Sequence, residues 1–104
     1  MPTDQTPAST ETSPRPVENA LTRIRSALPQ MSRIASRIAV HVLENPAEVV
    51  GMSITELADA SEASEGSVIN FCRGIGLSGF QHLKLSLAQE IVQTVQFIHE
   101  DLSR

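Results

Sequence analysis

From residue 17 onward, apolar residues recur with the period of amphipathic helices, and no segment alternates in the way that a half-buried strand does. The pattern predicts a first helix over residues 17–28, which Pro29 ends. A second helix is predicted over residues 31–43, with Ser32 as its N-cap. Residues 46–51 are expected to form a short turn. The fold class expected from this pattern is all-α.

Two short helices follow, over residues 53–61 and 64–75, and only two or three residues separate them. Ser53 and Glu56 have the spacing of a capping box, and Ser64 is placed to cap the second helix. Two short helices joined this closely inside a helical domain have the layout of a helix-turn-helix. The pattern therefore predicts a five-helix bundle that contains a helix-turn-helix.

The second short helix has an apolar face and a polar face. The apolar face, expected to point inward, consists of Val68, Phe71, Cys72 and Ile75. At 100° per residue, Gly66, Asn70 and Arg73 then point outward. Ser67 and Gly74 lie on one flank of this outward face. An arginine can bind guanine and an asparagine adenine through paired hydrogen bonds, and a glycine lets a backbone approach closely.

The alternative interpretation is an ordinary solvated helix face. The two glycines weigh against it, because a glycine inside an exposed helix costs about 1 kcal/mol relative to alanine.

After Gly76, which supplies a left-handed residue at the end of this helix, a fifth helix is predicted over residues 79–99. One of its apolar stripes consists of Phe80, Leu83, Leu87 and Ile91. A second, displaced stripe consists of Leu85, Ala88, Val92, Val95 and Ile98. This wide apolar face predicts a homodimer through helix 79–99. The alternative is that the helix only closes the core of its own domain.

Composition divides the chain near residue 16. Residues 1–16 hold four of the six prolines, six Ser or Thr, and none of Val, Ile, Leu or Phe. Such a segment buries too little apolar surface to offset its ordering entropy, so we expect a disordered tail followed by one domain over residues 17–100. The 104 residues suffice for a single small domain.

Several kinds of chemistry lack the residues they need. Cys72 is the only cysteine and falls on an apolar face, and the three histidines are scattered, so no disulfide, metal site or cofactor is expected. No paired carboxylates or nucleophile–base pair suggest catalysis, and we expect no enzyme. No apolar run is long enough to span a membrane, which favours a cytoplasmic protein.

The formal net charge of −4 argues at first against a nucleic-acid partner, but the charges are segregated. Residues 20–43 hold four arginines and no acid, whereas residues 44–65 hold six acids and no base. Arg33, Arg37 and His41 form a ladder of like charge, which repels itself unless an anion lies beside it. Two anions are considered: DNA phosphate, and the acids of residues 44–65 in the same or a partner subunit.

Three stretches together resemble the N-terminal domain of the RpiR family of bacterial transcriptional regulators. They are Ser53-Ile-Thr-Glu-Leu-Ala58, residues 64–76 with the run Phe71-Cys72-Arg73, and Gly79-Phe-Gln-His-Leu-Lys84. The resemblance covers roughly residues 17–92. It implies a homeodomain-like or winged-helix-like domain that binds operator DNA as a dimer, attached in the family to a C-terminal domain that senses a phosphosugar.

The chain departs from the family pattern in three respects. It ends about where the linker to the sensor domain would begin, so that domain is expected to be absent, and a phosphosugar effector is expected only if it exists. Asn70 and Gly74 stand where the family often has basic residues. Glu62 stands where the family often has a turn glycine, and a left-handed conformation there would cost roughly 1 kcal/mol. The alternative is that the turn adopts another shape.

The resulting hypothesis is a sequence-specific DNA-binding domain of a bacterial regulator of sugar or related carbon metabolism, with double-stranded operator DNA as its partner. Asn70 and Arg73 are expected to read bases, and Gly66 to allow close approach. The residues expected to position phosphates are Ser53, Thr55, Ser64, Ser67 and Lys84. The rival hypothesis is a dimeric helical protein-interaction module that has lost DNA binding.

Overall fold

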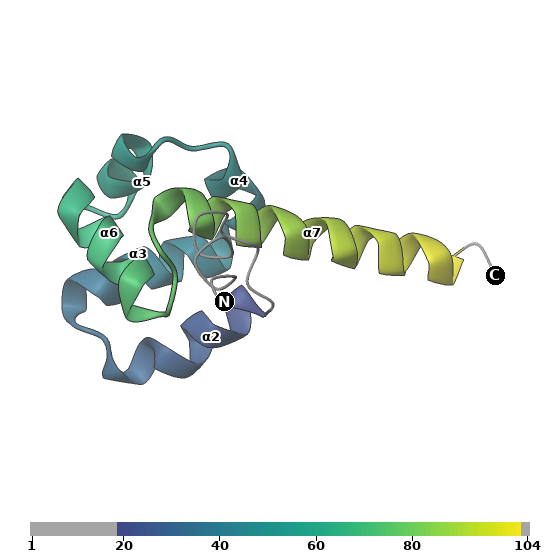
Figure 1. Cartoon of the computed structure of the whole chain (residues 1–104), viewed down its shortest axis with the longest axis horizontal. Helices are drawn as coiled ribbons and strands as arrows, with labels where there is room; N and C mark the ends of the chain where they lie inside the picture. Colours follow the sequence, from purple (N-terminus) through teal and green to yellow (C-terminus); the bar gives the residue numbers. More distant parts are fainter. Residues whose placement is uncertain (1–18, 103–104) are drawn as a thin grey trace, which may run out of the picture.

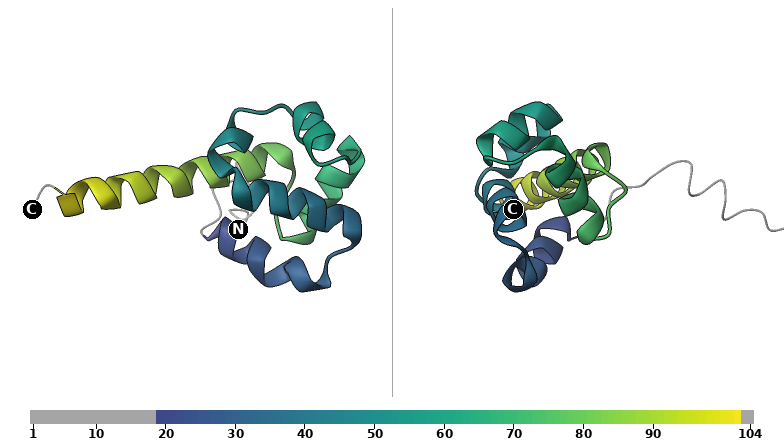
Figure 2. Two further views of the ribbon diagram at one scale, coloured as in Figure 1. Left: turned by 180° about the vertical axis from the view of Figure 1, so that it is seen from behind. Right: turned by 90° about the vertical axis from the view of Figure 1, so that its left-hand side faces the viewer.

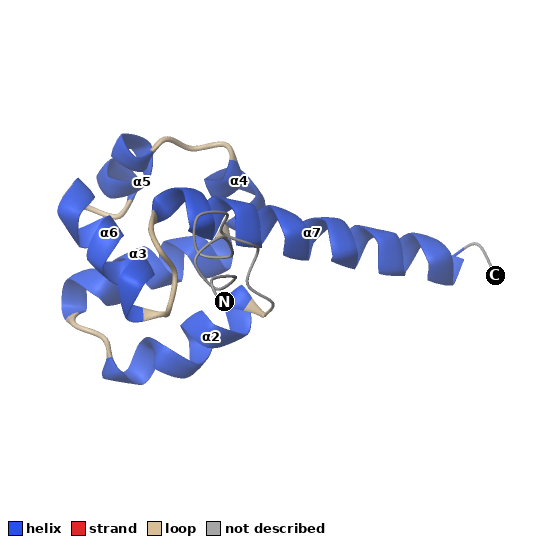
Figure 3. Ribbon diagram, in the orientation of Figure 1, coloured by secondary structure: helices blue, strands red, loops and turns tan. Residues whose placement is uncertain are grey.

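The computed structural model describes residues 19–102, and their side chains as far as residue 92. Within residues 19–102 every regular element is helical, which confirms the all-α class (Figure 3). In chain order the elements are α2 (Ala20–Ala27), the short 3-10 helix η2 (Leu28–Gln30), α3 (Arg33–Glu44), α4 (Pro46–Val50), α5 (Ile54–Ala60), α6 (Glu65–Gly74) and α7 (Phe80–Leu102). The predicted tail over residues 1–16 lies outside the described residues.

Two local predictions need correction. Most of the segment 46–51 forms the one-turn helix α4 (Pro46–Val50) rather than a turn, because Pro46 fits the first helical position and Val49 is fully buried. Pro29 does not stop the first helix outright, since the chain continues through η2 to Gln30. Both differences lengthen the helical path without changing the order of the main helices.

The helices enclose one core, from which α7 extends as a long arm (Figures 1 and 2). The N-terminal turns of α7 pack against α4, α2 and α6. The predicted inner face of α6 is buried, and the Cys72 thiol lies so deep that burial raises its pKa to about 12. No helix within the described residues is long and apolar enough to cross a membrane.

The end of α6 is closed by a turn and by an arginine from another helix. Gly76, with φ 91°, donates its amide to the carbonyl of Arg73 (3.0 Å), and Leu77 donates to Cys72 (2.9 Å), which is the Schellman pattern. Nη1 of Arg23 on α2 donates to the carbonyl of Ile75 at 3.3 Å. A Cβ at position 76 would lie 2.9 Å from this Nη1, so the glycine also leaves room for the arginine.

The end of α5 repeats this arrangement without a glycine. The amide of Glu62 donates to Asp59 (3.2 Å) and that of Ala63 to Ala58 (2.8 Å), with Glu62 itself left-handed at φ 57°. From α3, Arg37 donates through Nε to the carbonyl of Ser61 (3.2 Å) and through Nη2 to that of Glu62 (2.9 Å). Hydrogen bonds to charged groups contribute about 1.5–3 kcal/mol, enough to offset the strain at Glu62.

The partners of Arg37 are neither of the two anions considered for the arginine ladder. Its partners are main-chain oxygens at the C-terminus of α5, where the helix dipole is negative. Its contact with Glu62 is to the carbonyl and not to the carboxylate. Arg37 therefore fixes the turn of the helix-turn-helix.

We predict that Arg37→Ala lowers the free energy of unfolding by about 1.5–3 kcal/mol, because the carbonyls of Ser61 and Glu62 at the end of α5 lose their charged partner. Arg33→Ala is the matched control, one turn earlier on α3 and exposed, and should change stability by less than about 0.5 kcal/mol. Urea denaturation followed by circular dichroism measures both. Equal effects of the two substitutions would contradict the assignment.

Candidate nucleic-acid interface

The outward face of α6 is polar and accessible, in the orientation predicted from its periodicity. Gly66, Asn70, Arg73 and Gly74 are exposed, and Ser67 is half-buried on one flank. Packing of Val68, Phe71 and Cys72 into the core fixes this orientation. Arg23, which donates to the carbonyl of Ile75, holds the C-terminal end of the helix. The face is thus presented on a helix secured along its inner side.

The N-termini of α5 and α6 lie together. Ser53 accepts a hydrogen bond from the amide of Glu56 (3.1 Å), whose carboxylate accepts from the amide of Ser53 (2.9 Å), so the predicted capping box is present. Ser64 likewise accepts from the amide of Ser67 at 3.1 Å. The hydroxyl of Thr55 donates to a carboxylate oxygen of Glu65 at 2.5 Å, which links the two helix ends.

Four predicted phosphate-binding hydroxyls, those of Ser53, Thr55, Ser64 and Ser67, therefore gather at this double helix end. The hydroxyls of Ser64 and Ser67 also contact each other at 2.9 Å. Their contact with phosphate stays a prediction, and the hydroxyl proton of Thr55 is donated to Glu65, which was not among the predicted site residues. A carboxylate at the start of α6 is expected from the helix dipole alone. Its bond to Thr55 joins residues ten apart, and no local sequence pattern indicates it.

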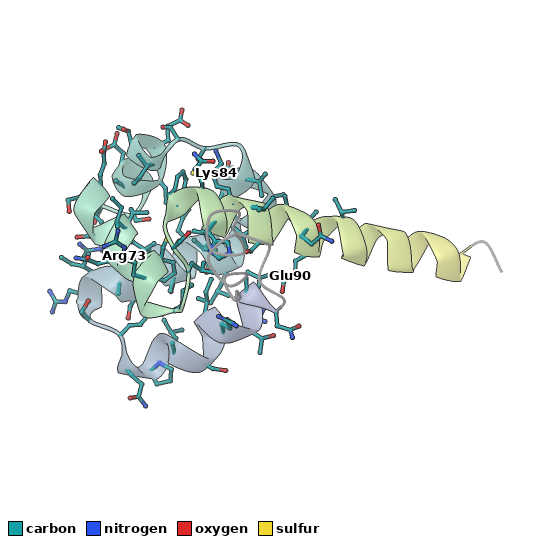
Figure 4. The ribbon with its side chains drawn as sticks, in the orientation of Figure 1. Arg73, Lys84 and Glu90 are labelled. Atoms are coloured by element: carbon teal, nitrogen blue, oxygen red, sulfur yellow. The ribbon has the colours of Figure 1, made fainter. Side chains whose placement is uncertain are left out.

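Lys84 does not lie with the other predicted residues. It belongs to α7, whereas Arg73 belongs to α6, and Figure 4 shows the two well apart. The ammonium of Lys84 lies 5.3 Å from the centroid of the Phe80 ring, within the range of a cation–π contact. A phosphate contact by Lys84 would thus be made at a different place from the α6 face.

The two glycines of α6 are not required by the packing of the domain. A Cβ at Gly66 would meet only the hydroxyl of Ser64, at 3.9 Å, and a Cβ at Gly74 would meet nothing within 4 Å. Both positions are exposed and lie in the first and last turns of α6, where alanine is favoured by up to about 1 kcal/mol. The fold therefore bears a cost at the outward face of α6 that its own interior does not explain.

A groove of about 490 Å³ runs along one flank of α6. Ser67, Asn70 and Gly74 line it on the α6 side, and the connection between α2 and α3 forms the opposite wall. Sequence reasoning missed this wall, because residues 30–35 lie far from α6 in the chain and carry no motif. A second groove, of about 430 Å³, lies between α3 and the end of α5, and charged side chains line it, among them Arg33, Arg37 and Glu44.

Comparison with known proteins places this geometry in a family. A family model described as the helix-turn-helix domain of the rpiR family matches residues 18–94. An HTH-type transcriptional regulator of Caldanaerobacter subterraneus subsp. tengcongensis is 41% identical over 75 residues, or 72% of this chain and 27% of that protein. HexR, an HTH-type transcriptional regulator of Pseudomonas aeruginosa, is 35% identical over 82 residues, or 79% of this chain and 29% of HexR.

A solved structure agrees. NanR of Vibrio vulnificus, complexed with ManNAc-6P, superposes with a TM-score of 0.71 and 34% identity over 73% of this chain and 29% of NanR. The chain thus spans under a third of the length of these relatives. The matched residues include both helices of the helix-turn-helix and the beginning of α7. The chain belongs to the rpiR family of helix-turn-helix transcriptional regulators, and residues 18–94 are its helix-turn-helix domain.

Proposed function

We propose that the domain binds operator DNA sequence-specifically in the bacterial cytoplasm, with α6 in the major groove. The observation that carries the proposal is the outward face of α6, where two glycines that the fold does not need stand beside Asn70 and Arg73. Glycines let the helix approach the base edges closely, and the two side chains suit adenine and guanine. The domain acts by binding and contributes no catalysis of its own.

The regulated genes belong, in this proposal, to sugar or related carbon metabolism. NanR, of which the chain covers 29%, was solved in complex with ManNAc-6P. A phosphosugar would act on this chain only through a further domain of the kind that the family carries.

A protein-interaction module that has lost DNA binding is the second candidate. The exposed acids of α5, Glu56 and Asp59, and the carboxylate of Glu65 at the start of α6 favour it, because they repel phosphate. Salt dependence separates the two functions. DNA binding weakens steeply as salt rises, because neutralised phosphates release counterions.

The glycines give the first test. Gly66→Ala and Gly74→Ala should each raise the free energy of unfolding by up to about 1 kcal/mol, since a methyl group has room at both positions. The same substitutions should weaken binding to a duplex selected by the wild-type protein from a random library. Thermal melts and fluorescence anisotropy measure the two quantities. Variants that gain stability and keep full affinity would remove the glycines from the interface.

Arg73 provides the test of sequence reading. Arg73→Ala should cost about 1–3 kcal/mol of binding free energy and relax preference at one base position, because paired hydrogen bonds to guanine are lost. Arg25→Ala, on the exposed surface of α2, is the control for loss of one positive charge. Titrations at about 50 and 200 mM salt should show a steep decline in wild-type affinity. No wild-type affinity for any selected duplex would favour the interaction module.

Dimerisation through α7 is the third part of the proposal. Leu85 and Val92 are 43% and 51% exposed, and with Ala88 they form the part of the predicted second stripe whose side chains are described. The predicted stripe continues to Val95 and Ile98, whose side chains lie outside the described residues. A helix of 23 residues is about 34 Å long. In the proposed dimer, the α7 helices of two copies would pack against each other along the part that extends from each core.

We therefore expect the wild-type protein to sediment as a dimer at tens of micromolar and Val92→Glu to sediment as a monomer. A carboxylate buried between two apolar helix faces has no partner and disfavours association. Val40→Glu places the same charge on α3 and should leave the dimer intact. A wild-type monomer at this concentration would contradict the dimer.

A further inference from the structure

The groove beside α6 has walls of a distinct chemical character. Its lining contains no charged residue and combines aliphatic side chains with uncharged hydrogen-bonding groups. On the wall opposite α6 these are Gln30, Met31, Ser32, Ile34 and Ala35. Ile34 is 41% exposed at this wall, which leaves a large aliphatic side chain in water.

The groove is continuous with the face that we assign to DNA. Ser67, Asn70 and Gly74 belong both to the groove and to the accessible side of α6. The opposite flank of α6 is occupied differently, since Glu65 there is bound to Thr55 of α5. When a recognition helix lies in the major groove, the elements beside it meet the two sugar–phosphate strands. The connection between α2 and α3 is the element beside α6 on the groove side.

The wall carries the groups that a sugar–phosphate strand needs. The faces of Met31 and Ile34 suit the apolar side of a deoxyribose, and the amide group of Gln30 can donate to a phosphate oxygen. Ser32 accepts a hydrogen bond from the amide of Ala35 at 3.1 Å, which leaves its own hydroxyl proton to donate. No acidic residue occurs between residues 20 and 43, so nothing on this wall repels phosphate.

We propose that this groove receives one sugar–phosphate strand of the duplex whose major groove holds α6. The inference rests on the proposed function. It assigns to residues 30–35 a contact that positions the domain on DNA and carries no sequence preference, because sugars and phosphates are alike at every base pair.

Two aliphatic residues of α3 make a matched test. Ile34 and Val40 are 41% and 40% exposed, but Ile34 lines the groove beside α6 and Val40 lines the separate groove beside Arg37. Ile34→Glu sets a carboxylate against the DNA strand and should weaken binding at least about tenfold. Val40→Glu adds the same charge elsewhere and should change affinity by less than about twofold. Gln30→Glu should act in the same direction as Ile34→Glu, and its exposed position away from the core protects it from failure to fold.

Affinities are measured by anisotropy on a duplex selected by the wild-type protein and on an unrelated duplex of equal length, with thermal melts for every variant. The expected result is a similar proportional loss on both duplexes for Ile34→Glu and Gln30→Glu. The inference would be overturned if three variants bound with equal affinity: Ile34→Glu, Gln30→Glu and Val40→Glu. Binding by the wild-type protein would in that case still support the proposed function. A loss confined to the selected duplex would also overturn the inference, because it would show base contact. Failure of the wild-type protein to bind any duplex would instead remove the proposed function itself.

Discussion

The arrangement of the helix-turn-helix depends on two arginines that hold its helices by their C-terminal ends. Arg37 of α3 donates to the carbonyls of Ser61 and Glu62, and Arg23 of α2 donates to that of Ile75. The last carbonyls of a helix carry partial negative charge and lack partners within the helix, so a planar guanidinium satisfies them well. With both C-termini attached to the N-terminal helices, the opposite ends of α5 and α6 remain accessible on one surface.

These arginine contacts reduce the positive charge that the chain has available for binding phosphate. Residues 20–43 hold four arginines and no acid, yet Arg23 and Arg37 donate to main-chain oxygens of the same domain. Fewer arginines of residues 20–43 are therefore available to contact phosphate than the sequence indicates. In the proposed function, a chain of net charge −4 built this way would depend less on general attraction to DNA and more on contacts made at the outward face of α6.

Sequence reasoning succeeded where the determining residues are close in the chain. The caps at Ser32, Ser53 and Ser64 and the left-handed Gly76 follow from groups three to five residues apart, so local patterns suffice. The arginine contacts join residues 24 to 52 positions apart, and Leu21 donates its amide to Glu90 of α7 across 69 positions. No spacing rule connects such pairs. Glu62 at an expected glycine position predicted either a strained turn or a turn of another shape, and neither prediction identified Arg37, which holds the left-handed turn.

The same contacts bear on how α6 can carry two glycines on its outward face. Each glycine costs up to about 1 kcal/mol in a helix of only ten residues. The cost is offset at the two ends, by Ser64 at the N-terminus and by the turn at Gly76 with Arg23 at the C-terminus, and along the inner face by Val68, Phe71 and Cys72. Stabilisation is thus placed on the sides of α6 that face the protein. The outward side is left free to be selected for what it contacts, which is the arrangement that the proposed reading role requires.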